Sequence, residues 1–126
     1  MKNKEDRSLL IVDDDKAFRD LLRYELERNG YRKLYEGGDG EEALDVVMKH
    51  HVDLVLLDLR MPKLEGEEVL KFVKENYPKI RVIILTGHPE GDTKKKVLGL
   101  GADAYLEKPY DSEELLTSIA KALEKK

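Results

Sequence analysis

An apolar run that stops at a carboxylate, within residues 52–62, constrains the fold of this chain more than any other stretch. Residues 53–57 are too few for a helix and nearly all apolar, which predicts a strand buried on both faces, as in a parallel sheet. Asp58 then follows the carboxyl end of a central strand, where open α/β sheets place their chemistry. Taken alone, an aspartate in this position is more often an ordinary turn residue. Whether Asp58 belongs to a functional site therefore depends on the rest of the chain.

Four further short apolar runs alternate with amphipathic helical patterns along the chain. They predict strands over residues 8–12, 31–36, 81–85 and 103–106. A helix is expected to follow each of the five strands. This pattern predicts an α/β fold with a doubly wound five-stranded parallel sheet, order 2-1-3-4-5, in a flavodoxin-like (βα)5 three-layer sandwich.

Local signals indicate where the helices begin and end. Asp15, Asp39 and Asp111 are expected N-caps, and Glu42 and Glu114 are expected capping-box partners of the last two. The first helix is expected to end at a left-handed cap formed by Asn29 and Gly30, and the third to stop before Pro78. The buried side of the fourth helix is expected to carry Val97, Leu98 and Leu100.

Length and composition narrow the class of protein. The 126 residues predict a single domain, residues 1–126, with a core over about residues 8–124. There is no cysteine, which excludes disulfides, thiolate chemistry and cysteine-ligated metals. No signal-peptide core or membrane-spanning stretch is present, so the cytoplasm is the expected compartment and no membrane contact is expected. The net charge of −4 argues against direct nucleic-acid binding.

Polar residues follow four of the predicted strands, and these four strands are consecutive neighbours in the predicted order. The residues are Asp13 and Asp14, Asp58, Thr86 and Lys108. Three clustered carboxylates favour a hard divalent cation, usually Mg²⁺ where phosphate oxygens are also bound. A lysine and a threonine hydroxyl suit an oxyanion. Such a site fits transfer of a phosphoryl group to a carboxylate.

These residues also carry a family resemblance. The sequence resembles the receiver domains of two-component response regulators, such as the chemotaxis regulators, over nearly its whole length. The matching segments are Leu-Ile-Val-Asp-Asp-Asp at residues 10–15, Leu-Asp-Leu-Arg-Met-Pro at 57–62 with Gly66 after it, Leu-Thr-Gly at 85–87, and Lys108-Pro109. Each segment is weak alone, but their order and spacing together are specific.

The resemblance implies a role for each matching residue. Asp58 would be the phosphoacceptor, and Asp13 and Asp14 the acidic pair that holds Mg²⁺, or Mn²⁺ as an alternative. Asp58 and the backbone carbonyl of Arg60 would complete the protein ligands. Lys108 would contact the phosphoryl group, and its peptide bond to Pro109 would be cis.

The resemblance also implies a switch. Thr86 would move toward the phosphoryl group and Tyr105 would change rotamer with it, altering the surface of the fourth helix, fifth strand and fifth helix. Arg60 and His88 would border the phosphoryl group and tune its lifetime. The phosphodonor would be a sensor histidine kinase or phosphotransfer protein, and the output a downstream protein target or a self-dimer. The chain would catalyse only its own phosphorylation and slow autodephosphorylation.

Alternatives exist at several positions. Asp13 and Asp14 would also fit helix caps, and Tyr105 ordinary half-buried packing. His50 and His51 would form a metal site with Asp53, although a solvated helix end is favoured. The lysine run at residues 94–96 would fit a contact for an acidic partner or nucleic acid, although a solvated face is favoured.

Two other functions suit this fold class. A flavin-binding electron carrier would need a phosphate-cradling loop after the first strand, where three aspartates stand instead and would repel the flavin phosphate. An aspartate-based phosphatase would carry its nucleophile after the first strand, which fits Asp58 and Lys108 less well.

Overall fold

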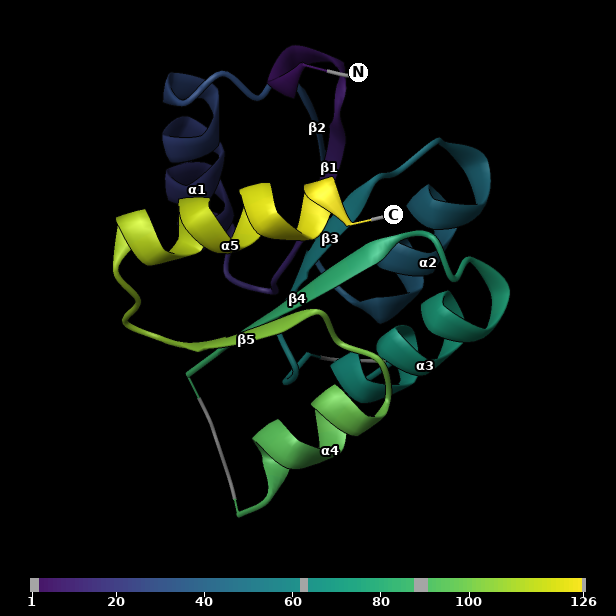
Figure 1. Ribbon diagram of the computed structural model, residues 1–126. Coiled ribbons are helices and arrows are strands. Elements are labelled where there is room, and N and C mark those ends of the chain that lie inside the picture. Colours follow the sequence, from purple (N-terminus) through teal and green to yellow (C-terminus); the bar gives the residue numbers. More distant parts are fainter. Residues whose placement is uncertain (1–2, 62–63, 88–90, 126) are drawn as a thin grey trace.

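The computed structural model describes residues 3–61, 64–87 and 91–125. Within these ranges five strands form one parallel sheet in the order β2-β1-β3-β4-β5, which confirms the predicted fold (Figure 1). The strands are β1 (Ser8–Val12), β2 (Lys33–Gly37), β3 (Leu54–Leu57), β4 (Arg81–Thr86) and β5 (Ala104–Glu107). The helices are α1 (Lys16–Arg28), α2 (Gly40–Lys49), α3 (Gly66–Asn76), α4 (Thr93–Gly99) and α5 (Ser112–Glu124), and a short 3₁₀ helix, Lys4–Asp6, precedes β1.

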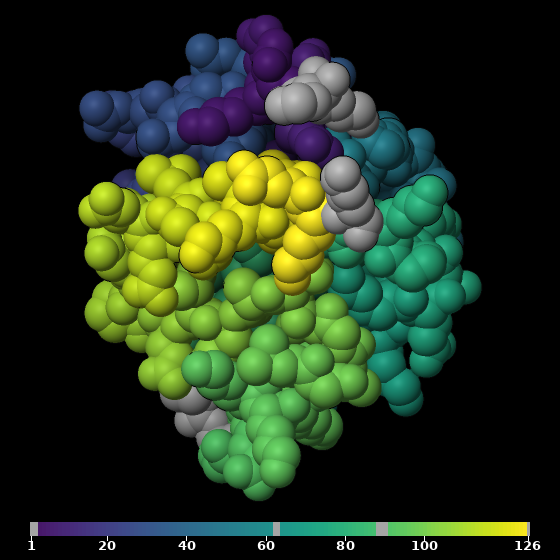
Figure 2. Space-filling view, in the orientation of Figure 1, coloured from purple at the N-terminus to yellow at the C-terminus, as the bar shows by residue number. Residues whose placement is uncertain are grey.

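Helices cover both faces of the sheet. Alternate residues of the central strands point to opposite faces. Leu10, Val55 and Ile84 join the core under α2, α3 and α4. Leu9 and Ile83 join the core under α1 and α5. Every residue of β1 and β3 is buried, as expected for strands covered on both sides. In the space-filling view, the yellow α5 crosses the visible face of the molecule, between the blue α1 and the green α4–β5 segment (Figure 2).

The second strand begins later than predicted. Tyr31, expected on this strand, instead follows the left-handed Gly30 (φ 98°), and its N–H donates to the Leu26 carbonyl at 3.1 Å. Its backbone therefore closes α1 and leaves only Lys33–Gly37 for β2. The Tyr31 ring is buried in the core under α1 and α5, which explains why an apolar residue precedes an otherwise polar edge strand.

Other local predictions were right in kind but wrong in detail. Asp15, Asp39 and Asp111 do cap α1, α2 and α5. The first capping box is half formed: Asp39 accepts from the N–H of Glu42 at 2.8 Å, but the Glu42 carboxylate accepts from the N–H of Gly38 instead of Asp39. At the second, Asp111 accepts from the N–H of Glu113 instead of Glu114. On α4, Val97 is buried but Leu98 is 41% exposed, because one residue turns a helix by about 100°.

No helix in the described ranges has both the length and the apolar character needed to cross a membrane.

Candidate functional site

The sheet ladder brings the ends of β1 and β3 together. The N–H of Asp58 donates to the Val12 carbonyl at 3.0 Å, and the N–H of Asp13 donates to the Gly37 carbonyl at 3.1 Å. Both carboxylates therefore leave the sheet at the same edge, one residue past their strands. On the other side of β3, the N–H of Lys108 donates to the Thr86 carbonyl at 2.8 Å, which holds β5 and β4 in step.

Three carboxylates meet at this edge. One carboxylate oxygen from each of Asp13, Asp14 and Asp58 lies within 4.8 Å of the other two. No other group of histidines and acids among the residues described is arranged so that it could hold a metal ion. Asp13 and Asp58 are buried, whereas Asp14 is exposed to solvent. One side of the cluster is thus held in the protein and the other is open to a ligand.

Each oxygen of the Asp13 carboxylate has a hydrogen-bond partner. Its Oδ1 accepts from the N–H of Asp15 at 2.9 Å, and its Oδ2 accepts from Lys108 Nζ at 2.5 Å. Ninety-five positions separate Asp13 from Lys108, so this ion pair fastens the end of β5 to the end of β1. The Lys108 ammonium also lies over the Phe18 ring, 3.9 Å from its centroid.

The surroundings of Asp58 change the pKa of its carboxyl group. Burial raises the pKa of its carboxyl; the Lys108 ammonium opposes this shift, and the charge of Asp13 reinforces it. Its Oδ1 is buried without a hydrogen-bond partner among the described residues. A buried carboxylate oxygen beside two further acids suits a divalent cation, because a cation would satisfy the oxygen and relieve the repulsion. The residues present therefore fit a bound Mg²⁺.

A close backbone approach positions Asp58. A Cβ at Gly66, the first residue of α3, would fall on the Asp58 carbonyl oxygen and within 2.6 Å of Leu59 Cα. Glycine therefore allows α3 to start directly against the segment that follows β3. The N–H of Gly66 donates to the Leu59 carbonyl at 3.0 Å.

The other predicted site residues that the structure describes lie on β4 and β5 or shortly after β3 and β5. Thr86 is fully buried at the end of β4, and the Lys108–Pro109 peptide bond is cis. Tyr105 is half-buried on β5, and its hydroxyl is buried without a hydrogen-bond partner within the described part of the chain. Arg60 is exposed. His88 lies outside the described residues.

Two contacts of the site were missed from the sequence. Phe18 of α1 has no role in the predicted site, and yet it lies under Lys108. Arg19 donates to the Asp13 carbonyl at 2.6 Å and pairs with Glu36 at 3.0 Å, so it fixes the loop after β1. Neither residue type is unusual in an amphipathic helix, so no local signal distinguished them.

The histidine alternative is not supported. The ring of His50 stacks on Tyr35 with 4.7 Å between centroids, and His51 Nε2 lies 3.0 Å from Asp53 Oδ1. These residues do not form one of the acid and histidine groups that could hold a metal in the described chain.

Comparisons with known proteins show the family to which the chain belongs. Residues 9–120 match the family model of the response regulator receiver domain. The chain is 39% identical over 115 residues to sporulation initiation phosphotransferase F of Bacillus subtilis, covering 91% of this chain and 92% of that protein. It is 39% identical over 111 residues to response regulator MprA of Mycobacterium sp. (strain KMS), covering 88% of this chain but only 48% of that longer protein.

A solved structure shows the same fold. The CheY-like response regulator receiver domain protein of Methanospirillum hungatei JF-1 superposes with a TM-score of 0.88 at 32% identity, over 93% of each chain. The family match, the two sequence relatives and this structural neighbour all indicate the same family. The chain belongs to the response regulator receiver domain family of two-component systems.

Proposed function

We propose that this receiver domain accepts a phosphoryl group on Asp58 from a phosphohistidine of a sensor histidine kinase or phosphotransfer protein. The observation that carries the proposal is the buried, unpartnered Oδ1 of Asp58, at a strand end and within 4.8 Å of two other carboxylates. An acid in this position would ordinarily be costly. The buried Asp58 carboxylate suits phosphoryl transfer because one of its oxygens can bind a cation while the other attacks phosphorus.

In the proposed step, an oxygen of the Asp58 carboxylate attacks the phosphorus in line with the bond to the donor imidazole. The new O–P bond forms as the P–N bond breaks, and the bonding electrons leave with the imidazole nitrogen. Slow attack of water on the same phosphorus returns the carboxylate and releases phosphate. The domain is therefore a switch that acts on itself.

The cation would be held by the carboxylates of Asp13, Asp14 and Asp58 and by the backbone carbonyl of Arg60. Mg²⁺ is the expected ion, with Mn²⁺ as an alternative. When bound, it would neutralise charge on the transferring phosphoryl oxygens. Asp13 is oriented for this role by the N–H of Asp15 and by Lys108.

Lys108 and Thr86 would bind the phosphoryl oxygens. The ammonium of Lys108 already lies against Asp13, so a phosphoryl group on Asp58 would offer it a second anion nearby. Thr86 ends the neighbouring strand and can donate its hydroxyl to an oxyanion. Arg60 and His88 would border the phosphoryl group and adjust the rate at which water reaches it.

Tyr105 is the proposed relay to the surface. Its hydroxyl has no hydrogen-bond partner among the described residues, so no such bond opposes a change of rotamer. It lines a cavity of about 460 Å³ with Lys94 of α4 and Glu114 of α5. A change at Tyr105 would therefore alter the α4–β5–α5 surface, which we propose as the docking face for a downstream protein or a second copy of this chain.

The test is phosphorylation by a small donor. The protein is incubated with Mg²⁺ and acetyl phosphate, and its intact mass is measured beside Asp58→Asn and Asp20→Asn variants. Asp20 is an exposed acid on α1 that pairs with Lys16, and it serves as the matched control. We expect one Mg²⁺-dependent phosphoryl adduct on the parent and on Asp20→Asn, and none on Asp58→Asn. An adduct that persists in Asp58→Asn, or no adduct on the parent, would refute the proposal.

A further inference from the structure

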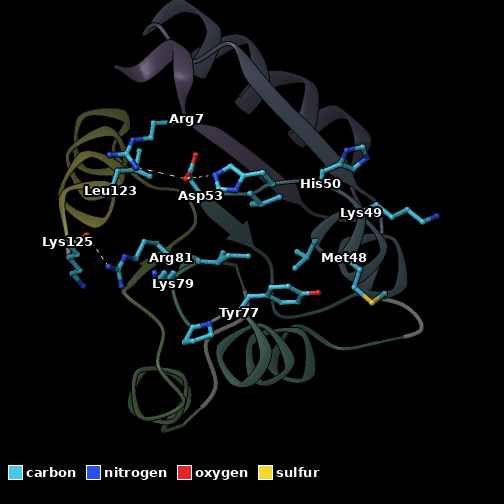
Figure 3. Close-up of a pocket in the computed structure, with 15 residues that line it drawn as sticks. Arg7, Met48, Lys49, His50, Asp53, Tyr77, Lys79, Arg81, Leu123 and Lys125 are labelled. Carbon is cyan, nitrogen blue, oxygen red and sulfur yellow. Dashed lines mark hydrogen bonds and ion pairs between the residues drawn. The ribbon is translucent and has the colours of Figure 1, made fainter. Parts of the chain in front are cut away.

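A cavity of about 820 Å³ opens at the edge of the sheet opposite the phosphoacceptor (Figure 3). It lies where β3 and β4 begin, whereas Asp58 and Thr86 lie where these strands end. Asp53 lines the cavity, and the five positions from it to Asp58 span about 16 Å of extended chain. The cavity is therefore a separate place on the molecule. Its volume falls within the range of about 300–1,000 Å³ that is typical of small-molecule sites.

Part of the wall of this cavity is apolar. Val52 and Ile80 are buried and form part of it, and Met48 of α2 is 56% exposed at its edge. The other large apolar side chains of the lining are Val47, Tyr77 and Leu123. An exposed methionine beside a tyrosine offers an adaptable surface for an aromatic or aliphatic body.

The charges of the lining are strongly one-sided. Five of the lining residues are permanent cations, from four separate parts of the chain: Arg7, Lys49, Lys79, Arg81 and Lys125. Asp53 is the only acid among the lining residues that the structure describes. The whole chain carries a net charge of −4, so this grouping runs against its average composition. Figure 3 shows Arg7, Arg81, Lys79 and Lys125 on one side of the cavity, with Lys49 and Met48 on the other.

The existing contacts do not neutralise all of these cations. Asp53 accepts from the N–H of Ser8 at 2.8 Å and from His51, with Arg7 4.0 Å away. Lys49 pairs with Asp45, and Lys125 with Asp103. The cavity also lies at the carboxyl ends of α2, α3 and α5. Each helix end carries a partial charge of about −0.5, which offsets part of the positive charge of the lining.

Two cations remain without a carboxylate. Within the ranges described, neither Lys79 nor Arg81 makes an ion pair. Arg81 donates one N–H to the Lys125 carbonyl at 3.0 Å, and its guanidinium has four further N–H donors. Both residues come from the short segment that enters β4, and both line the cavity, as do Tyr77 and Leu123.

We propose that this cavity binds a small organic anion with an aromatic or aliphatic body. Its carboxylate, sulfonate or phosphate group would lie between Lys79 and Arg81, and its apolar body against Met48, Tyr77 and Leu123. This site is independent of phosphorylation at Asp58.

The probe for the test is 8-anilinonaphthalene-1-sulfonate, whose fluorescence rises in an apolar site. The matched neutral probe is N-phenyl-1-naphthylamine, which has the same rings without the sulfonate. We expect saturable binding of one anionic probe per chain and much weaker binding of the neutral one. Equal binding of the two probes, or binding without saturation, would overturn the proposal.

Variants locate the anion. Lys79→Gln/Arg81→Gln should weaken binding of the anionic probe about tenfold, which is about 1.4 kcal/mol for two partly exposed charge contacts. The matched control is Lys71→Gln/Lys95→Gln, which removes the same charge from exposed positions on α3 and α4 and should bind as the parent does. Unchanged binding by the first pair, or an equal loss in the second, would refute the assignment.

Chemical-shift mapping on the unmodified protein avoids any folding defect of a variant. Addition of the anionic probe should shift the backbone amides of Met48, Asp53, Tyr77 and Arg81. Shifts centred on Asp58 and Thr86 would place the probe at the other edge and overturn the proposal. The Asp58→Asn variant should bind the probe as the parent does, so failure of the phosphoacceptor proposal and failure of this one are distinguishable.

Discussion

Removal of the Asp103 carboxylate should be among the most damaging single changes in this protein. Asp103 precedes β5, and its side chain is only 9% exposed. One oxygen accepts from Lys74 Nζ at 2.9 Å and from the N–H of Val82 at 2.8 Å, and the other accepts from Lys125 Nζ at 3.2 Å. Lys74 in turn donates to the Ile80 carbonyl at 2.8 Å. One carboxylate thus ties α3, β4 and α5 to the entry of β5.

The magnitude follows from what Asp103→Ala leaves behind. Breaking a buried pair by removing one partner costs about 3–5 kcal/mol, and an unsatisfied backbone donor such as the N–H of Val82 costs about 1–3 kcal/mol. Lys74 retains the Ile80 carbonyl, and its side chain is 14% exposed, so some of its solvation is recovered. These effects overlap, and we expect a total loss of about 3 kcal/mol.

The assay is urea unfolding followed by circular dichroism. With a slope of about 1–3 kcal/mol/M, the loss lowers the midpoint by about 1 M or more. The matched control is Asp20→Ala, which breaks a pair whose side chains are 76% and 56% exposed and should cost at most about 1 kcal/mol. The reasoning is wrong if Asp103→Ala is no more damaging than this control.

The same carboxylate predicts a pH dependence. Burial by itself would raise the pKa of Asp103, but the hydrogen bonds from Lys74 and Val82 outweigh it and hold the pKa below its ordinary value of 3.8. Because the folded-state pKa is the lower one, its stabilisation is complete above about pH 5. It is lost as the pH falls below 3.8 toward the folded-state value. The difference in stability between parent and Asp103→Ala should shrink over that range, and a difference that stays constant would contradict this account.

Two further predictions test the packing of the site. Gly66→Ala should cost about 1–3 kcal/mol by overpacking against Asp58 and should slow phosphorylation by acetyl phosphate; Gly99→Ala, where an added Cβ meets nothing within 4 Å, should do neither. Burial is the main cause that raises the pKa of Tyr110 to about 12. Absorbance titration of the tyrosines in the parent and in Tyr110→Phe should therefore differ by one tyrosine that ionises near pH 12. The folded protein keeps this proton where the unfolded chain releases it, so stability should fall as the pH rises from about 10 toward 12. A Tyr110 component that titrates near 10 would contradict the burial argument.

The order of the elements and the edge that carries the site were readable from the sequence. Apolar runs of four to six residues between helical patterns leave few topologies open, because parallel strands need right-handed crossovers. Once the order is known, Asp13, Asp58, Thr86 and Lys108 must meet at one edge, since the carboxyl ends of parallel strands share it. Their chemical types then indicate a cation and an oxyanion.

Only the tertiary structure decided which side chains act between elements. Tyr31 was predicted on an edge strand and instead closes α1, because its N–H bonds back to the helix. Phe18 and Arg19 look like any residues of an amphipathic helix, and yet they position Lys108 and the loop after β1. The cationic cavity is assembled from residues as distant as Arg7 and Lys125. Periodicity and caps act within about one turn or strand, whereas these contacts depend on how separate elements pack, which no local pattern records.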